Sequence, residues 1–132
     1  MEYANLIERA IEARNRAYAP YSEFGVGAAL LCKDGTVYTG CNVENASYGL
    51  CNCAERTAIF KAVSDGAGDF EAIVIVGGKI GEDIDFCPPC GACRQVMAEF
   101  CDDDFEIVLS NGTDERIYTL KDLLPVRFDN LD

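Results

Sequence analysis

The sequence predicts an α/β fold in which a mixed five-stranded sheet is flanked by helices. Two observations support this prediction. The expected elements are a helix, two strands and then helices and strands in alternation, an order that is typical of layered α/β domains. A continuous apolar run over 72–76 is typical of a strand that is buried on both faces. At 132 residues, we expect a single domain over 1–132.

The first part of the chain predicts a helix followed by a hairpin. Apolar side chains recur at helical spacing over 3–18, and Pro20 interrupts the pattern. The segments 24–32 and 36–42 are expected to be strands. A Lys-Asp-Gly turn at 33–35 joins them and indicates antiparallel pairing.

The second part alternates helices and strands. A polar loop over 43–52 precedes a predicted helix over 53–64. The remaining expected elements are strand 72–76, helix 91–101, strand 105–109, strand 116–119 and helix 119–124. We expect the crossover connections in this part to produce parallel strand pairs.

Charge and hydropathy exclude several partner classes. The chain has 23 acidic and 11 basic residues, a net charge of -12. Such a surface repels phosphate backbones, so we expect no nucleic-acid partner. Acidic residues replace the basic region of a signal peptide, and the apolar stretches are too short to span a membrane. We therefore expect a cytoplasmic protein with no membrane partner.

Histidine is absent and cysteine is abundant. Without histidine, Ser-His and Cys-His catalysis and imidazole metal ligands are excluded. The eight cysteines would suggest disulfides in a secreted protein, but a chain of this length folds without them. We interpret the clustered cysteines as metal ligands and the scattered ones as small buried side chains. The clustered ones are Cys51, Cys53, Cys87, Cys90 and Cys93, and the scattered ones are Cys32, Cys41 and Cys101.

Three cysteines have the arrangement of a catalytic zinc site. Cys90 and Cys93 lie three residues apart at the predicted start of a helix, which places both sulfurs on one face. Cys53 stands at the start of the other central helix, and helix N-termini favour thiolate over thiol. Three thiolates would bind zinc and leave a fourth position for water, as in catalytic sites.

Glu55 is the candidate proton carrier. It follows Cys53 by two residues and is offset around the helix, so it is not an obvious metal ligand. In a chain without histidine, a carboxylate near the metal-bound water is the natural group for proton transfer. The alternative is a first-turn residue that only interacts with the helix dipole.

These residues belong to longer motifs that resemble one enzyme family. Cys53-Ala54-Glu55, followed by PCGAC at 89–93, matches the all-cysteine form of the zinc-deaminase motif. Further similar segments are YAPYS at 18–22, VGAAL at 26–30, NVENASYG at 42–49, CAER at 53–56 and CGACRQ at 90–95. The chain resembles the short cytidine deaminases over essentially its whole length.

The resemblance implies a fold, a reaction and a cofactor. The implied fold is the three-layer cytidine-deaminase-like arrangement. The implied reaction is hydrolytic deamination of cytidine and 2′-deoxycytidine to uridine and 2′-deoxyuridine plus ammonia, a step of pyrimidine salvage, with zinc-bound hydroxide attacking C4. One Zn²⁺ per chain would be held by Cys53, Cys90 and Cys93, with Glu55 as the proton shuttle.

The resemblance also implies a nucleoside site. Asn42 and Glu44 would hydrogen-bond the ribose, chiefly its 3′-hydroxyl, and Phe24 would pack against the pyrimidine. Ala54 and Tyr48 complete the implied contacts. The residues alone leave two alternatives open. One is that Phe24 belongs to a strand core, and the other is that Asn42 and Glu44 are residues of a solvated loop. An antibiotic-nucleoside deaminase of the same fold is an alternative, although Asn42, Glu44 and Tyr48 favour cytidine.

Two further residues have expected roles at the edge of the site. The resemblance implies a homotetramer with shared active sites, in which Phe128 reaches into a neighbouring site. Three thiolates give the zinc centre a net negative charge, which opposes deprotonation of bound water. Arg56 would offset this charge by hydrogen-bonding the thiolates with its forked donors. The alternative for Arg56 is an ordinary surface ion pair.

Other interpretations of the cysteines stay open at this stage. Cys87, Cys90 and Cys93 have the local spacing of an iron–sulfur segment, which would indicate an electron-transfer protein. Cys51 would complete a closed four-cysteine structural zinc site. Neither interpretation gives a purpose to Glu55 or to the polar loop before it.

Overall fold

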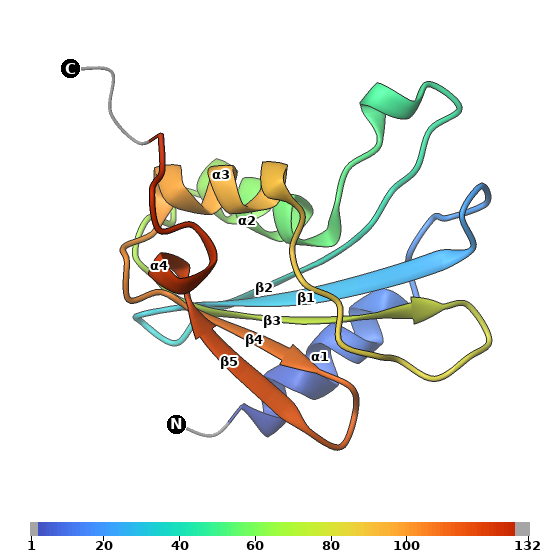
Figure 1. Ribbon diagram of the computed structural model, residues 1–132, viewed down its shortest axis with the longest axis horizontal. Coiled ribbons are helices and arrows are strands. Elements are labelled where there is room, and N and C mark those ends of the chain that lie inside the picture. Colours follow the sequence, from blue (N-terminus) through green and yellow to red (C-terminus); the bar gives the residue numbers. More distant parts are fainter. Residues whose placement is uncertain (1–2, 129–132) are drawn as a thin grey trace.

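A five-stranded sheet separates the helices of the described chain into two layers (Figure 1). The computed structural model describes residues 3–128, with helix α1 on one face of the sheet and helices α2 and α3 on the other. The strands are β1 Phe24–Cys32, β2 Val37–Cys41, β3 Phe70–Lys79, β4 Glu106–Ser110 and β5 Glu115–Thr119. The helices are α1 Ala4–Arg14, α2 Ala54–Ser64, α3 Gly91–Phe100 and α4 Leu120–Leu123, with a 3₁₀ turn η1 at Tyr48–Leu50. This is the three-layer mixed α/β fold predicted from the sequence.

The strand order is β2-β1-β3-β4-β5. β1 pairs antiparallel with both β2 and β3, β3 pairs parallel with β4, and β4 pairs antiparallel with β5. The predicted hairpin is present, with Leu31 opposite Val37. The expectation of parallel pairs at both crossovers was wrong for the first one. β1 lies between β2 and β3, so the crossover through α2 joins strands that are not neighbours.

The central strand β3 is buried on both faces, as its apolar run predicts. Ile73 and Ile75 belong to the core cluster that includes residues of α2 and α3. Val74 and Val76 belong to the opposite cluster, with residues of α1. The alternation follows from the two-residue period of a strand. β3 therefore anchors both helical layers.

Helix α1 ends four residues earlier than the amphipathic pattern over 3–18 predicts. The guanidinium of Arg14 donates to the carbonyls of Gly25 at 3.0 Å and Gly78 at 2.8 Å. The chain then turns back, and the amide of Tyr18 donates to the carbonyl of Asn42 at 3.0 Å. The bond of Tyr18 satisfies an amide that a longer helix would have paired locally.

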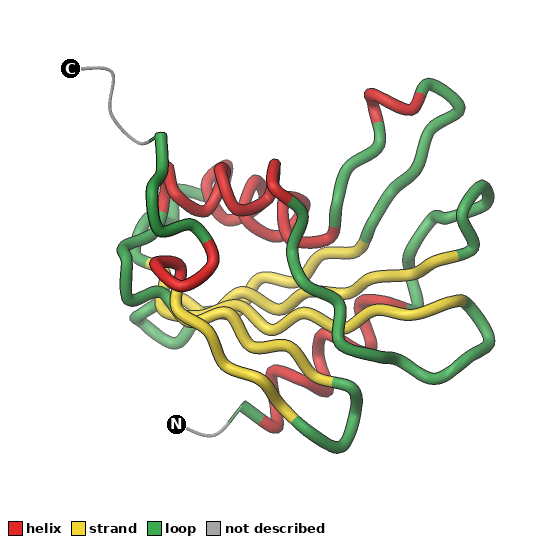
Figure 2. The backbone as a smooth tube through the Cα atoms, in the orientation of Figure 1, coloured by secondary structure: helices red, strands yellow, loops and turns green. Residues whose placement is uncertain are grey.

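The loops that carry most candidate residues gather at one end of the sheet (Figure 2). β1 begins at this end and β3 ends there, because the two strands are antiparallel. The segments 15–23, 42–53 and 80–90 therefore come close together. None of the described helices is long and apolar enough to cross a membrane; the expected cytoplasmic location stays a prediction.

Candidate active site

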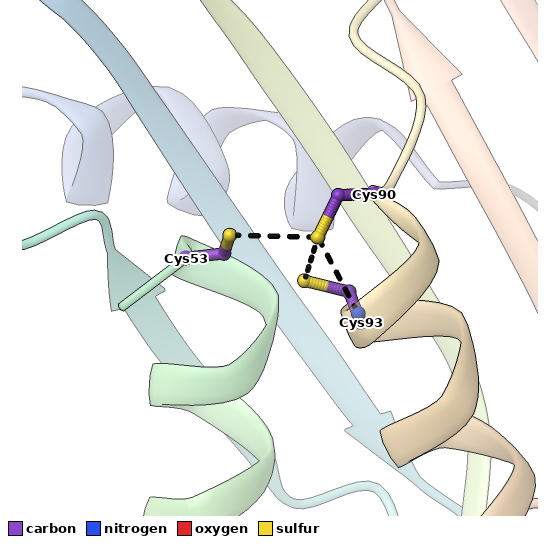
Figure 3. Close-up of side chains that lie close together, drawn as sticks. All are labelled: Cys53, Cys90 and Cys93. Atoms are coloured by element: carbon purple, nitrogen blue, oxygen red, sulfur yellow. Dashed lines mark hydrogen bonds between the residues drawn. The ribbon is translucent and has the colours of Figure 1, made fainter. Parts of the chain in front are cut away.

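The N-termini of α2 and α3 meet and bring three cysteines together (Figure 3). Cys53 is the N-cap of α2 and Cys90 is the N-cap of α3, both with extended backbone conformation. Cys93 lies in the first turn of α3, and its backbone amide donates to the sulfur of Cys90 at 3.4 Å. Each helix N-terminus places partial positive charge beside the sulfurs.

The three sulfurs have the spacing of a metal site. They lie within 4.8 Å of one another. The sulfur of Cys90 is 3.8 Å from that of Cys53 and 3.3 Å from that of Cys93. Three thiolates bound tetrahedrally to zinc, each at about 2.3 Å, would lie about 3.8 Å apart. The donor set therefore fits zinc and leaves one tetrahedral position for another ligand.

Cys53 and Cys93 shift each other's pKa in opposite directions. The Cys93 thiol, followed by the hydrogen bonds with Arg56 and Cys90, lowers the pKa of the Cys53 thiol well below its usual range. Interaction with Cys53, together with burial, raises the pKa of Cys93. The group therefore favours the thiolate at Cys53. This favours metal binding, because metals bind deprotonated sulfur.

Glu55 is buried beside these sulfurs. It lies in the first turn of α2, and only 4% of its surface is exposed. Burial raises the pKa of Glu55 from 4.5 to about 7, and the charge of Cys53 adds to this effect. Such a carboxyl can both accept and release a proton near neutral pH. A role limited to the helix dipole does not require burial; the role of Glu55 as proton carrier stays a prediction.

Arg56 approaches the sulfurs from α2. Its Nη2 donates to the sulfur of Cys53 at 3.4 Å. Its Nε is buried and has no hydrogen-bond partner among the described residues. Within residues 3–128, the ion pairs do not include Arg56, so the alternative of a surface ion pair is not supported. The guanidinium lies where it can offset thiolate charge.

A cavity of about 570 Å³ opens beside the sulfur group. This size is within the range of small-molecule sites. Its lining combines residues of the segment before β1, of β1, of the 42–53 segment, of the start of α2 and of the segment before α3. They are Ser22, Val26, Asn42, Glu44, Tyr48, Gly49, Cys51, Asn52, Cys53, Ala54, Glu55, Arg56, Cys87, Pro88 and Cys90.

Asn42 and Glu44 line the cavity and are both held in place. Asn42 Oδ1 accepts from the amide of Val26 at 2.8 Å, and Nδ2 donates to the carbonyl of Phe24 at 2.8 Å. Glu44 accepts from the backbone amide of Ser22 at 3.1 Å and from its hydroxyl. The hydroxyl bond, followed by the amide bond, lowers the pKa of Glu44. Neither residue is a loosely solvated loop side chain.

Of the three aromatic residues predicted for the site, one lines the cavity and two do not. Tyr48 lines the cavity but is 90% exposed. Phe24 is at the start of β1, 38% exposed, and is not among the residues that line the cavity. Phe128 is 66% exposed and also lies outside the lining of this chain's own cavity. The structure thus brings together the predicted site residues except these two phenylalanines, and the roles of all of these residues stay predictions.

Comparison with known families decides which enzymes share this arrangement. Residues 1–109 match the family described as the cytidine and deoxycytidylate deaminase zinc-binding region. The chain belongs to this family. As a member of the cytidine and deoxycytidylate deaminase family, the protein is a zinc-dependent hydrolase, and its three-cysteine group fits the metal.

Similar proteins cover nearly the whole chain. A cytidine deaminase of Sporosarcina psychrophila is 50% identical over 133 residues, which covers 100% of this chain and 95% of the relative. A cytidine deaminase of Halalkalibacterium halodurans is 54% identical over 129 residues, covering 97% and 95%. The crystal structure of cytidine deaminase from Burkholderia pseudomallei matches with a TM-score of 0.88 and 55% identity, covering 97% of this chain and 100% of that one.

In this deaminase, Cys51 and Cys87 lie outside the sulfur group. Among the described residues, only the three cysteines at the helix N-termini form a group that can hold a metal. The sulfur of Cys51 instead accepts from the amide of Asn45 at 3.3 Å and donates to its carbonyl at 3.6 Å. The iron–sulfur and closed four-cysteine interpretations were therefore wrong.

Sequence reasoning missed several residues that line the cavity of this deaminase. Ser22 and Val26 lie within the motifs at 18–22 and 26–30, so a signal was present. Their place in the site depends on the pairing of β1 with β2 and β3, which no local pattern contains. Asn52 and Pro88 had no signal beyond adjacency to a ligand or a clustered cysteine.

Proposed function

We propose that this enzyme deaminates cytidine and 2′-deoxycytidine, releasing ammonia and leaving uridine or 2′-deoxyuridine, as a step of pyrimidine salvage. The observation that carries the proposal is the buried carboxyl of Glu55 beside three cysteine sulfurs, in a cavity that suits a nucleoside. The relatives named cytidine deaminase support the same substrate.

Cys53, Cys90 and Cys93 would hold one zinc ion per chain, because their sulfurs have the spacing that tetrahedral zinc requires. When bound, zinc supplies Lewis-acid activation of a water molecule. The chain contributes two helix N-termini, which stabilise the thiolates and keep them available as ligands.

Glu55 would move the protons of the reaction. Hydrolytic deamination removes protons from the attacking water oxygen and adds them to N3 of the base and to the departing amino group. With a pKa of about 7, the Glu55 carboxylate can accept the proton of the water and deliver it to N3. It can then transfer the hydroxyl proton to the amine that leaves C4. The burial of Glu55 limits proton exchange with solvent.

Asn42 and Glu44 would bind the ribose, chiefly its 3′-hydroxyl. After the bonds that position them, the amide keeps a second donor hydrogen and the carboxylate keeps further lone pairs. Ala54 and Tyr48 would add contacts from α2 and η1, and Phe24 would pack against the pyrimidine. A plain ribose satisfies these groups, which favours cytidine over an antibiotic nucleoside.

Arg56 would balance the charge of the metal centre. Zn²⁺ with three thiolates carries excess negative charge, and the guanidinium beside Cys53 offsets part of it. In the metal-free protein, Arg56→Gln is expected to raise the pKa of the Cys53 thiol, which thiolate absorbance during a pH titration measures. An unchanged titration would contradict this role.

The assembly proposed for this enzyme is a homotetramer with shared active sites. Its support is the exposure of large apolar residues near the cavity and at the C-terminal segment. These are Tyr48 at 90%, Leu50 at 70%, Val126 at 93% and Phe128 at 66%. Residues exposed to this degree on one chain are available for burial between chains.

The decisive experiment is incubation of the zinc-loaded protein with cytidine and with 2′-deoxycytidine, followed by the ultraviolet change to the uridine products. Glu55→Gln should retain zinc but lower kcat by at least about 10²-fold to 10⁴-fold, the usual contribution of a general acid–base group. Near-normal turnover by a zinc-replete Glu55→Gln enzyme would overturn the role of Glu55. Turnover of an antibiotic nucleoside but not of cytidine would overturn the substrate.

A further inference from the structure

Cys87 is a cavity residue to which the proposed function gives no role. It is half-buried, lines the cavity and lies outside the sulfur group. A β-carbon added to Gly77 would lie 2.9 Å from both Cβ and Sγ of Cys87, and 3.3 Å from Cε1 of Phe24. Cys87 therefore packs directly on the backbone of β3, next to the ring that we propose to contact the base.

The segment that carries Cys87 is fixed on the sheet. Two residues earlier, the amide of Asp85 donates to the carbonyl of Gly77 at 2.8 Å. The guanidinium of Arg116, on β5, lies 3.9 Å from the centre of the Phe86 ring and holds it by a cation–π interaction. Two prolines follow Cys87 and restrict the backbone up to the first metal ligand of α3. Cys87 is thus part of a rigid wall.

Cys87 lines the same cavity as Cys53 and Glu55. Burial, followed by the charges of Glu55 and Cys53, raises the pKa of Cys87 to about 11. The thiol is uncharged at neutral pH and offers a small apolar surface. Cys51 differs, because its sulfur is hydrogen-bonded to the backbone of Asn45, within the 42–53 segment that also carries the proposed ribose ligands.

We propose that Cys87 is a specificity-determining residue whose small side chain forms the cavity wall against the pyrimidine and limits the size of the base. This inference rests on the proposed function, which places the C4 amino group, and hence the base, beside Glu55. One additional carbon in an apolar pocket changes kcat/KM by about 10-fold or more. The residue at 87 should therefore select among bases and have little effect on the choice of sugar.

The test compares Ala, Ser and Leu at position 87 with the same three residues at position 51. The substrates are cytidine, the base-enlarged 5-methylcytidine and N4-methylcytidine, and the sugar-altered 2′-deoxycytidine. Zinc content and circular dichroism are measured for every variant. We expect Cys87→Leu to lower kcat/KM for cytidine by about 10-fold or more, chiefly through KM, with zinc retained.

Cys87→Ala should raise the ratio of kcat/KM for at least one base-enlarged substrate to that for cytidine several-fold, while the deoxyribose-to-ribose ratio stays within about 2-fold. The Cys51 series should not change the base ratios. If Cys87→Leu does not fold, Cys87→Ala decides, because a smaller residue cannot clash. Unchanged base ratios in a zinc-loaded Cys87→Ala enzyme, or equal changes in the Cys51 series, would overturn the inference. Failure of the wild-type enzyme to act on any cytidine would instead contradict the proposed function.

Discussion

Five cysteines lie at the cavity or the metal group, and zinc content should separate their roles. Serine at Cys53, Cys90 or Cys93 is expected to lose zinc, because an alcohol remains protonated where a thiolate must bind. Cys51→Ser and Cys87→Ser are the matched controls and should retain one zinc per chain, since neither sulfur belongs to the group. Metal analysis of the five purified variants is the measurement. Zinc loss in either control would show that the ligand set is wrong.

The buried carboxyl of Glu55 should make the stability of the metal-free protein depend on pH. Its pKa is 4.5 when exposed and about 7 in the folded state, so the folded state binds more protons than the unfolded state between these values. The free energy of unfolding therefore falls as the pH rises through this window. The full shift of the Glu55 pKa corresponds to a loss of up to about 3 kcal/mol in the free energy of unfolding at pH values above this window.

Glu55→Gln removes this ionisation. The metal-free variant should be more stable than the wild type by up to about 3 kcal/mol near pH 8, and the difference should shrink toward zero near pH 4. Urea unfolding of the reduced, metal-free proteins across this range measures it. A difference that does not vary with pH would mean that Glu55 ionises as easily in the folded protein as in the unfolded chain.

At the scale of elements, the position of α2 depends on the absence of a side chain at Gly40, in β2. A β-carbon at Gly40 would lie 2.5 Å from the carbonyl oxygen of Ala54 and 2.6 Å from the amide nitrogen of Ala58. Both atoms are helix backbone, so they cannot move without moving α2. The residues that carry the chemistry, Cys53 and Glu55, are at the start of the same helix.

Gly40→Ala should therefore displace α2, lower the free energy of unfolding by at least about 2 kcal/mol and weaken zinc binding. Gly68→Ala is the matched control, because no atom lies within 4 Å of a β-carbon there. Chemical unfolding and competition for zinc with a chelator provide the two readouts. Equal behaviour of the two variants would show that the contact of α2 with β2 does not position the metal site.

At the scale of the whole molecule, the exposed C-terminal aromatic residue tests the assembly. We expect sedimentation to show a homotetramer at assay concentrations. Phe128→Ala should lower kcat/KM by about 10-fold or more, as truncation of a buried aromatic anchor usually does. A fully active monomer would contradict shared active sites.

Mixed oligomers provide a sharper form of this test. In a mixture of Phe128→Ala and Glu55→Gln chains, the first kind keeps its own Glu55 and can receive Phe128 from a neighbour of the second kind. Activity of the co-assembled mixture should therefore exceed the sum of the two separate variants. A merely additive activity would show that Phe128 acts within its own chain.

The sequence by itself determined the elements and the three cysteines of the candidate metal site. Hydrophobic periodicity and turn residues are local signals, so the hairpin at 33–35 and the buried strand β3 could be predicted within a few residues. The spacing of Cys90 and Cys93 is also local, because a helix fixes the relative positions of residues three apart. The motif around Glu55 added the enzyme family.

Only the tertiary structure decided how these parts meet. The antiparallel pairing of β1 with β3, the early end of α1 and the burial of Glu55 all depend on partners that are distant in the sequence. The same holds for the two cysteines that could not be assigned from spacing. The sulfur of Cys51 is hydrogen-bonded to the backbone of Asn45, whereas Cys87 is packed on Gly77. The physical reason is that a contact between distant segments depends on the summed packing of the whole chain, which no local pattern of residues contains.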